Sequence, residues 1–202
     1  IELGPRGTGK SYAYSEFSPY STLLSGGQTT TATLFYNKVK SQVGIIGYWD
    51  VVAFDEVAGI KVKDPGTIQI LKDYMANGHF NLVTEVMAPA SLAFVGNIDD
   101  SIEQLVRSER YDLFKPLPKA FDLALMHRMY YYLPGWEVAQ PGSDMLTNNF
   151  GFITDYLAEA MHHLTKSQNR SSYVQTNCKL GPAIVGRDEK AIIKTVSAFL
   201  KL

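Results

Sequence analysis

The stretch LGPRGTGKSY, residues 3–12, decides the fold that the rest of the chain has to build. Its segment GPRGTGKS matches the pattern G-x-x-x-x-G-K-[ST] at every fixed position. Glycines there let backbone N–H groups curl around a phosphate, and a helix beginning near Gly9 turns its positive end toward the anion. Lys10 would reach the β- and γ-phosphate oxygens, and the Ser11 hydroxyl would bind Mg²⁺. We expect the nucleotide contacts of this stretch to come from Gly4, Pro5, Arg6, Gly7, Thr8, Gly9, Lys10, Ser11 and Tyr12.

Two later strands are expected to end in polar side chains. The run DVVAFDE, residues 50–56, is typical of a buried parallel strand, and ligands bind where parallel strands end. Asp55 would therefore emerge beside the phosphate-binding stretch and help to hold Mg²⁺, while Glu56 would polarise the attacking water. The run SLAFVGNI, residues 91–98, ends near Asn97, whose amide could orient that water. The alternatives are two solvated carboxylates and an ordinary turn-forming asparagine.

Apolar runs alternate with helical patterns over most of the chain, which predicts an α/β fold with a doubly wound parallel sheet. The segment from Asp64 to Gly78 is the clearest helix, because it has a capping residue, a proline in its first turn and a terminal glycine. Further helices are expected at about 10–17, within TTTATLFYN and at 101–107. Strands are expected at STLLS, WDVVAFDE, SLAFVGNI and, last, residues 128–136, with a hairpin within 76–89.

The character of the sequence changes after Pro134 and Gly135, where two amphipathic helical patterns follow, GFITDYLAEAMHHLTKSQN and GRDEKAIIKTVSAFLKL. The first pattern has one apolar face, formed by Ile153, Leu157, Ala160, Met161 and Leu164. His162 and His163 are neighbours and so point about 100° apart around a helix, which makes them poor co-ligands of a metal. We interpret them as surface residues. The expected organisation is an α/β unit at residues 1–137 and a helical lid at 143–202, with nucleotide bound between them.

Composition sets limits on the function. The 202 residues are 46% hydrophobic and 19% charged with a formal net charge of -1, so no global basic field indicates a nucleic-acid partner. The single cysteine, Cys178, cannot form an intrachain disulfide, which suits a cytoplasmic protein. No apolar run approaches the roughly 18 residues that span a bilayer, so no membrane association is expected.

The order of these features resembles that of the AAA+ ATPases: phosphate loop, acidic strand end, asparagine-ended strand, late arginine and C-terminal helices. The stretch RMYYYLPGWE, residues 128–137, is similar to the arginine-finger strand of Lon-type proteases. Together with LLSGGQTTTATLFYN and VAFDEVAG, it is closer still to the Lon-like ATPases of BREX phage-defence systems. The resemblance covers essentially the whole chain. It implies a P-loop NTPase fold, here expected with a truncated first strand because so little sequence precedes Gly4, within a longer protein.

The resemblance also implies a role for each residue at the expected sheet edge: Walker A for Lys10 and Ser11, Walker B for Asp55 and Glu56, and sensor 1 for Asn97. Arg128 would be the arginine finger, which acts on ATP in a neighbouring subunit, and Arg110 is its rival for that role. His127 stands where an aspartate commonly precedes the finger. Arg187 would be sensor 2, contacting phosphate from the lid of its own subunit.

A finger supplied by a neighbour implies a homo-oligomer, a hexameric ring that uses ATP and Mg²⁺. Lon proteases carry an aromatic, glycine-rich pore segment before the acidic strand, and Tyr36, Tyr48 and Trp49 lack that context here. The expected hairpin, with His79, Phe80 and Asn81 near its start, instead resembles the pre-sensor hairpin of replicative helicases. Three functions therefore stay open: a motor that acts on DNA in phage defence, the ATPase of a protease that unfolds protein substrates, and a nucleotide-gated switch.

Overall fold

The computed structural model describes residues 1–25, 28–62, 64–108 and 112–202. Its main feature is a sheet of five strands, all parallel. In spatial order the strands are β11 (Leu133–Pro134), β1 (Glu2–Gly4), β10 (Ser91–Asn97), β6 (Val51–Asp55) and β2 (Ser21–Ser25). The central strands β6 and β10 are apolar because both of their faces are covered, and Phe54 of β6 stacks on Phe94 of β10 with ring centroids 5.1 Å apart.

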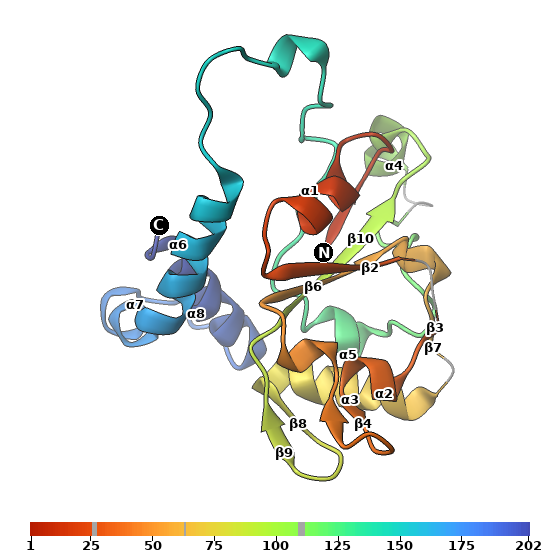
Figure 1. The fold of residues 1–202 in the computed structure, drawn as a ribbon, viewed down its shortest axis with the longest axis vertical. Helices are drawn as coiled ribbons and strands as arrows, with labels where there is room; N and C mark the ends of the chain where they lie inside the picture. Colours follow the sequence, from red (N-terminus) through yellow and green to blue (C-terminus); the bar gives the residue numbers. More distant parts are fainter. Residues whose placement is uncertain (26–27, 63, 109–111) are drawn as a thin grey trace.

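Helices cover both faces of this sheet, as the doubly wound arrangement requires (Figure 1). Helix α1 (Lys10–Glu16) packs against β2 and β6, whereas α3 and α5 lie on the other side of the sheet. The remaining helices of the α/β part are short: α2 (Thr31–Leu34), α4 (Ile102–Arg107), α5 (Leu123–Met126) and the 3-10 turns η1 (Ile45–Gly47) and η2 (Val57–Gly59). The expected α/β fold class is therefore confirmed.

Helix α3 (Pro65–Asn77) forms where the sequence predicts it, and its ends show why. The Asp64 side chain accepts a hydrogen bond from the Gly66 N–H at 2.9 Å. Pro65 suits the first turn because N–H groups there have no partner within the helix, and proline has no N–H. Gly78 ends the helix at φ 76°, a left-handed conformation that suits glycine, and its N–H bonds the Tyr74 carbonyl at 2.7 Å. Ile68, Leu71 and Tyr74 are buried on its inner face.

Three small two-stranded pairs complete the α/β part. One is parallel and joins β3 (Gln28–Thr29) to β7 (Lys61–Val62). Two are antiparallel hairpins, β4 (Tyr36–Asn37) with β5 (Gln42–Val43), and β8 (His79–Asn81) with β9 (Glu85–Met87). The second hairpin lies within the expected range 76–89, so that prediction is confirmed, whereas the other pairs were not expected from the sequence.

The prediction of a long last strand over residues 128–136 is wrong. Only Leu133 and Pro134 pair with β1, because β1 itself offers a partner over just three residues. The residues before them continue from α5 as a turn, in which the Arg128 and Met129 N–H groups bond the carbonyls of Leu125 and Met126. Arg128 therefore lies on a turn rather than on a strand.

Three helices form the C-terminal part, α6 (Thr154–Ser167), α7 (Ser171–Asn177) and α8 (Arg187–Phe199). The sequence predicts α6 and α8 but not α7. An exposed segment, residues 138–153, arches over α1 before α6 begins, and its only helical turn is η3 (Ser143–Met145) (Figure 1). The division into units at 1–137 and 143–202 stays a prediction.

The C-terminal helices do not cover the phosphate loop as expected, and they pack at the opposite edge of the sheet, where the strands begin. One contact is made by His162 of α6, whose ring stacks on Tyr20 at 3.8 Å and whose Nδ1 bonds the Asp50 carboxylate. The Lys166 ammonium is a donor only, so His162 Nε2, 2.8 Å away, accepts its hydrogen bond and carries no proton. The ring proton is then on Nδ1, which donates a hydrogen bond to Asp50. The prediction that His162 is a surface residue is therefore wrong, while His163 is exposed as expected.

The expected apolar face of α6 meets the sheet only in part: Leu157 and Met161 line a cavity together with Val51 and Ser91. Ala158 is the one buried side chain of α6 among the described residues, whereas Ile153, Leu157 and Met161 keep 70%, 46% and 39% of their surface exposed. Polar contacts with residues remote in sequence hold the helix as well: His162 contacts Tyr20 and Asp50, and Glu159 accepts a hydrogen bond from the Tyr20 hydroxyl.

Candidate nucleotide site

The loop between β1 and α1, residues 5–9, has the backbone geometry of an anion cradle. Gly7 and Gly9 adopt φ values of 80° and 77°, in the left-handed region that a side chain would strain. Gly9 is also the residue that precedes α1, so the free N–H groups of the helix face the concave side of the loop. The conformation is the one that the GPRGTGKS motif predicts.

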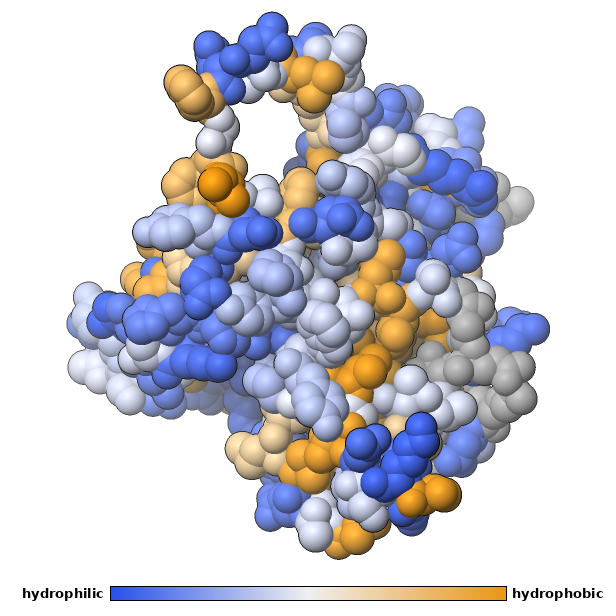
Figure 2. Space-filling model, viewed as in Figure 1, coloured by the Kyte–Doolittle hydropathy of each residue, from blue (hydrophilic) through white to orange (hydrophobic). Residues whose placement is uncertain are grey.

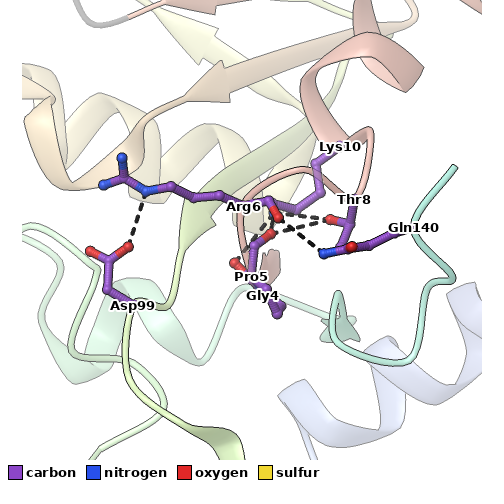
Figure 3. Close-up of polar contacts among 7 residues, drawn as sticks. All are labelled: Gly4, Pro5, Arg6, Thr8, Lys10, Asp99 and Gln140. Atoms are coloured by element: carbon purple, nitrogen blue, oxygen red, sulfur yellow. Dashed lines mark hydrogen bonds and ion pairs between the residues drawn. The ribbon is translucent and has the colours of Figure 1, made fainter. Parts of the chain in front are cut away.

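Lys10 is folded back into this loop, and only 6% of its surface is exposed. Its ammonium donates to three oxygens, the carbonyls of Pro5 at 2.5 Å and Gly4 at 3.3 Å and the Thr8 hydroxyl at 3.1 Å (Figure 3). Burial lowers the pKa of Lys10, and the carboxylates of Glu2 and Asp55 oppose that shift. A cation held among neutral oxygens at the centre of the loop is a strong attractor for a phosphate.

The carboxyl ends of the strands bring the polar residues to the same edge of the sheet. The register pairs Gly4 of β1 with Asn97 of β10, and the Ile98 N–H bonds the Gly4 carbonyl at 3.0 Å. Asp55 ends the next strand along, β6, and is close enough to Lys10 to influence its pKa. The structure therefore brings Lys10, Asp55 and Asn97 together, as the sequence predicts, although their catalytic roles stay predictions.

Glu56 has an unusual backbone. Its φ and ψ are 47° and 50°, a left-handed conformation that is uncommon for a residue with a side chain. Its N–H donates to the Asp55 carboxylate at 2.8 Å, and its carbonyl accepts from the Gly59 N–H at 2.7 Å. The turn therefore leaves the Glu56 side chain exposed directly beyond the strand end. Strain of this kind concentrates at functional sites.

Sequence reasoning missed several contacts of the loop that come from distant parts of the chain. Gln140 reaches the loop from the segment after β11, and its Nε2 donates to the Arg6 carbonyl at 3.5 Å (Figure 3). The Arg6 side chain points the other way and pairs with Asp99 at 3.0 Å. Gln140 and Asp99 do not belong to any motif. No pattern in the sequence could have indicated that residues 138–141 return to the phosphate loop.

A buried acid lies below the loop on β1. Glu2 is 6% exposed, and burial raises the pKa of its carboxyl, opposed by a hydrogen bond from Tyr14 of α1. Burial and the same carboxylate raise the pKa of the Tyr14 hydroxyl above its ordinary value. Glu2 was not predicted as a site residue, since a lone acid at the start of a strand gives no signal. It supplies negative charge near Lys10 from beneath the loop.

Arg128 lies far from the loop of its own chain. It lines a cavity of about 660 Å³ together with Ile1 and Ser91, which stand where β1 and β10 begin. Helix α8 closes the other side of this cavity with Lys194, Thr195 and Ala198. The Arg128 Nη1 donates to the Ala124 carbonyl, and its buried Nε has no partner among the described residues.

The other expected nucleotide residues have simpler positions. Ser11 is half-buried in the first turn of α1, and Tyr12 is 62% exposed with its ring against Phe17. Arg187 begins α8 and is exposed, and within the described ranges no hydrogen bond or ion pair connects it to the phosphate loop. Arg110 lies outside the described residues. The structure thus does not bring Arg187 to the loop.

The oxygen donors at this edge suit Mg²⁺ rather than a metal held by protein alone. Among the residues that the structure describes, no group of three or more His, Cys, Asp or Glu side chains could hold an ion. Mg²⁺ is usually bound by one or two carboxylates together with phosphate oxygens and water, which is what the Asp55 carboxylate and Ser11 hydroxyl offer. Among the described residues, no helix combines the length and the apolar character that crossing a membrane requires.

The family model described as "Lon-like protease BrxL-like, ATPase domain" matches residues 1–202. The chain belongs to this BrxL-like ATPase family. It is 50% identical over 204 residues to the Lon-like protease BrxL of Bacillus cereus and 50% identical over 203 residues to the Lon-like protease BrxL of Escherichia coli, with 100% of the chain covered in both comparisons. The chain spans 30% of the Bacillus cereus protein and 29% of the Escherichia coli protein. The resemblance to Lon-like ATPases is confirmed, and membership of an ATPase family implies the use of a nucleotide.

The position of Lys10 generates a prediction about pH. Only the charged ammonium attracts phosphate, so ATP affinity should decline as pH rises through the lowered pKa of Lys10, beginning below the ordinary lysine value of about 10.4. Titration of a fluorescent ATP analogue between pH 7 and 10 measures this decline. Lys10→Met should weaken binding at least roughly tenfold and remove the pH dependence, while exposed Lys119→Met should keep both. Affinity that stays constant up to pH 10 would contradict the assignment.

Proposed function

We propose that this chain is the ATP-binding and ATP-hydrolysing AAA+ motor of a Lon-like protein, acting on DNA in phage defence. The observation that supports hydrolysis is the meeting of Lys10, Asp55 and Asn97 at one sheet edge beside a glycine loop in left-handed geometry. The family description, which names an ATPase domain, points the same way.

Each residue at this edge has a chemical task in the proposal. Backbone N–H groups of residues 5–9 and the Lys10 ammonium hold the phosphates, and Ser11 and Asp55 hold Mg²⁺, which supplies charge neutralisation when bound. Glu56, exposed just beyond Asp55, accepts a proton from the attacking water. Asn97, on the strand between β1 and β6, orients that water through its amide.

The separation of Arg128 from the loop supports a homo-oligomer. Arg128 lines a cavity where β1 and β10 begin, at the sheet edge opposite its own loop, so a phosphate for it to contact would have to come from a second subunit. A head-to-tail contact of this kind closes into a ring when the rotation between subunits closes, and we propose a hexamer. The arginine would then neutralise charge that develops on the γ-phosphate of the neighbour.

A second function is favoured by the names of the relatives, both of which are described as Lon-like proteases. In that alternative the chain is the ATPase of a genuine ATP-dependent protease that unfolds protein substrates. The β4–β5 and β8–β9 hairpins contain no aromatic glycine-rich segment of the kind that Lon proteases carry, and this favours the first function.

Glu56→Gln should bind ATP normally and hydrolyse it about 10²- to 10⁴-fold more slowly, because the amide cannot accept the proton from water. Phosphate release and ATP binding, measured separately on the intact protein, test this. Exposed Glu103→Gln on α4 loses the same charge and should hydrolyse ATP at the normal rate. Undiminished hydrolysis in Glu56→Gln would rule out the proposed base.

Arg128→Ala should lower hydrolysis by about 10³- to 10⁵-fold while ATP binding is kept, since the finger acts only on developing charge. Lys10→Ala should lose ATP binding. Mixing the two inactive proteins should restore part of the activity, because an intact loop of the Arg128→Ala subunit then receives Arg128 from a Lys10→Ala neighbour. If mixtures stay as inactive as their components, Arg128 does not act between subunits.

The nature of the substrate is tested by stimulation of ATP hydrolysis. Addition of double-stranded DNA to the intact protein should raise the rate, and addition of casein should leave it unchanged and release no peptides. Glu56→Gln serves as the control for contaminating ATPases. Stimulation by casein with peptide release, and none by DNA, would establish the second function instead.

A further inference from the structure

Two antiparallel hairpins project from the α/β part at the same end of the molecule. The first consists of β4 and β5 with its tip at residues 38–41, and the second of β8 and β9 with its tip at 82–84. Figure 1 shows both at the lower end of the view, away from the phosphate loop. Neither hairpin contributes to the candidate nucleotide site.

The bases of the two hairpins are packed together. Phe35, directly before β4, is fully buried and meets Phe80 of β8 edge-to-face with ring centroids 5.0 Å apart. Tyr74 of α3 contacts both rings, each at 6.2 Å. The Gly44 N–H, just after β5, bonds the Phe35 carbonyl at 2.6 Å. Since aromatic side chains of this size are held tightly in a core, the two hairpins form one rigid body with α3.

The tip of the first hairpin has an ordered backbone. The Asn37 side-chain oxygen accepts hydrogen bonds from the N–H groups of Val39 at 3.1 Å and Lys40 at 3.0 Å. Ser41 completes the turn at φ 50°. An exposed tip that is fixed by its own side chain loses little conformational entropy when it binds a partner.

The chemistry of this tip is cationic. Val39 is 95% exposed, and Lys38 and Lys40 flank it on the surface. Neither lysine is ion-paired within the part of the chain that the structure describes. In Figure 2 the lower end of the molecule shows strongly hydrophilic residues beside hydrophobic ones. The second hairpin has no lysine or arginine, and its Glu85 pairs with His79 at 3.5 Å. The positive charge is thus confined to the β4–β5 tip.

We propose that the β4–β5 hairpin binds the phosphate backbone of DNA through Lys38 and Lys40. The proposal rests on the proposed action of this protein on DNA and identifies the surface that would carry it. DNA presents a uniform line of negative charge, one per about 1.7 Å of duplex, which two cations on a rigid support match whatever the sequence. An unfolded polypeptide has charges of both signs, so a pair of lysines offers no comparable complementarity. In a ring, the same tip on every subunit would engage successive phosphates.

The test is the salt dependence of DNA binding by the intact protein. Lys38→Ala/Lys40→Ala should reduce the slope of log affinity against log salt by about 0.9 for each phosphate contact that is lost. The matched control is Lys179→Ala/Lys190→Ala, which removes two exposed positive charges from the C-terminal part, one between α7 and α8 and one on α8, and should leave the slope unchanged. ATP hydrolysis without DNA should be normal in both double variants. Fluorescence anisotropy of a labelled duplex between 50 and 200 mM salt gives the slope.

The results separate this proposal from the proposed function. If the unaltered protein binds DNA and Lys38→Ala/Lys40→Ala binds with the same slope, the hairpin proposal is wrong while action on DNA stands. If the unaltered protein shows no salt-dependent DNA binding, action on DNA itself is wrong. Loss of casein stimulation in the variant, with an unchanged DNA slope, would assign the hairpin to polypeptide instead. A photo-reactive amino acid at Val39 that cross-links to the duplex supports the proposal independently of any loss of charge.

Discussion

The parallel pairing of β1 with β10 is the contact on which the candidate site depends. It sets Gly4, where the phosphate loop begins, opposite Asn97, and the pairing of β10 with β6 then brings Asp55 to the same edge. A slip of one residue in either pairing would turn every side chain of that strand to the other face of the sheet. The buried, stacked rings of Phe54 and Phe94, which are direct partners in the register of β6 and β10, help to fix that register.

The phosphate loop buries the Lys10 ammonium, which is unfavourable by itself, and surrounds it with contacts that compensate. An ammonium that is removed from water costs several kcal/mol unless hydrogen bonds and opposite charge offset it. Three oxygens contact the Lys10 ammonium, and the carboxylates of Glu2 and Asp55 act on it from two sides. The carbonyl oxygens carry only partial charge, so a phosphate that displaced them would be the stronger partner. The loop is therefore ordered before a nucleotide binds, and the Lys10 ammonium is already in place to contact a phosphate.

The parts of this structure that the sequence predicts are those whose causes are local. The loop follows from its glycines, and α3 follows from Asp64, Pro65 and Gly78, because each of these residues acts on its own neighbours. The failures arise from partners that are remote in sequence. The run after Arg128 reads as a strand, yet only two of its residues find a partner on the short β1. His162 reads as a surface residue until Tyr20 and Asp50 fold against it. The proposed roles of Arg128 and Arg187 likewise depend on remote partners, a second subunit or a different position of the C-terminal helices, rather than on neighbouring residues.

The close approach of β11 to β1 has a consequence for communication between subunits. A side chain on Gly4 would stand 2.5 Å from the Gly135 backbone, so the two main chains touch with nothing between them. The Gly135 N–H also bonds the Leu3 carbonyl at 2.8 Å. Any shift of the loop in response to a nucleotide is therefore passed directly to β11 and to the turn before it, which bears Arg128. In the proposed ring, a signal from one nucleotide site to the arginine proposed to act on the next would travel through peptide backbone alone, and substitutions of surface side chains would leave that route intact.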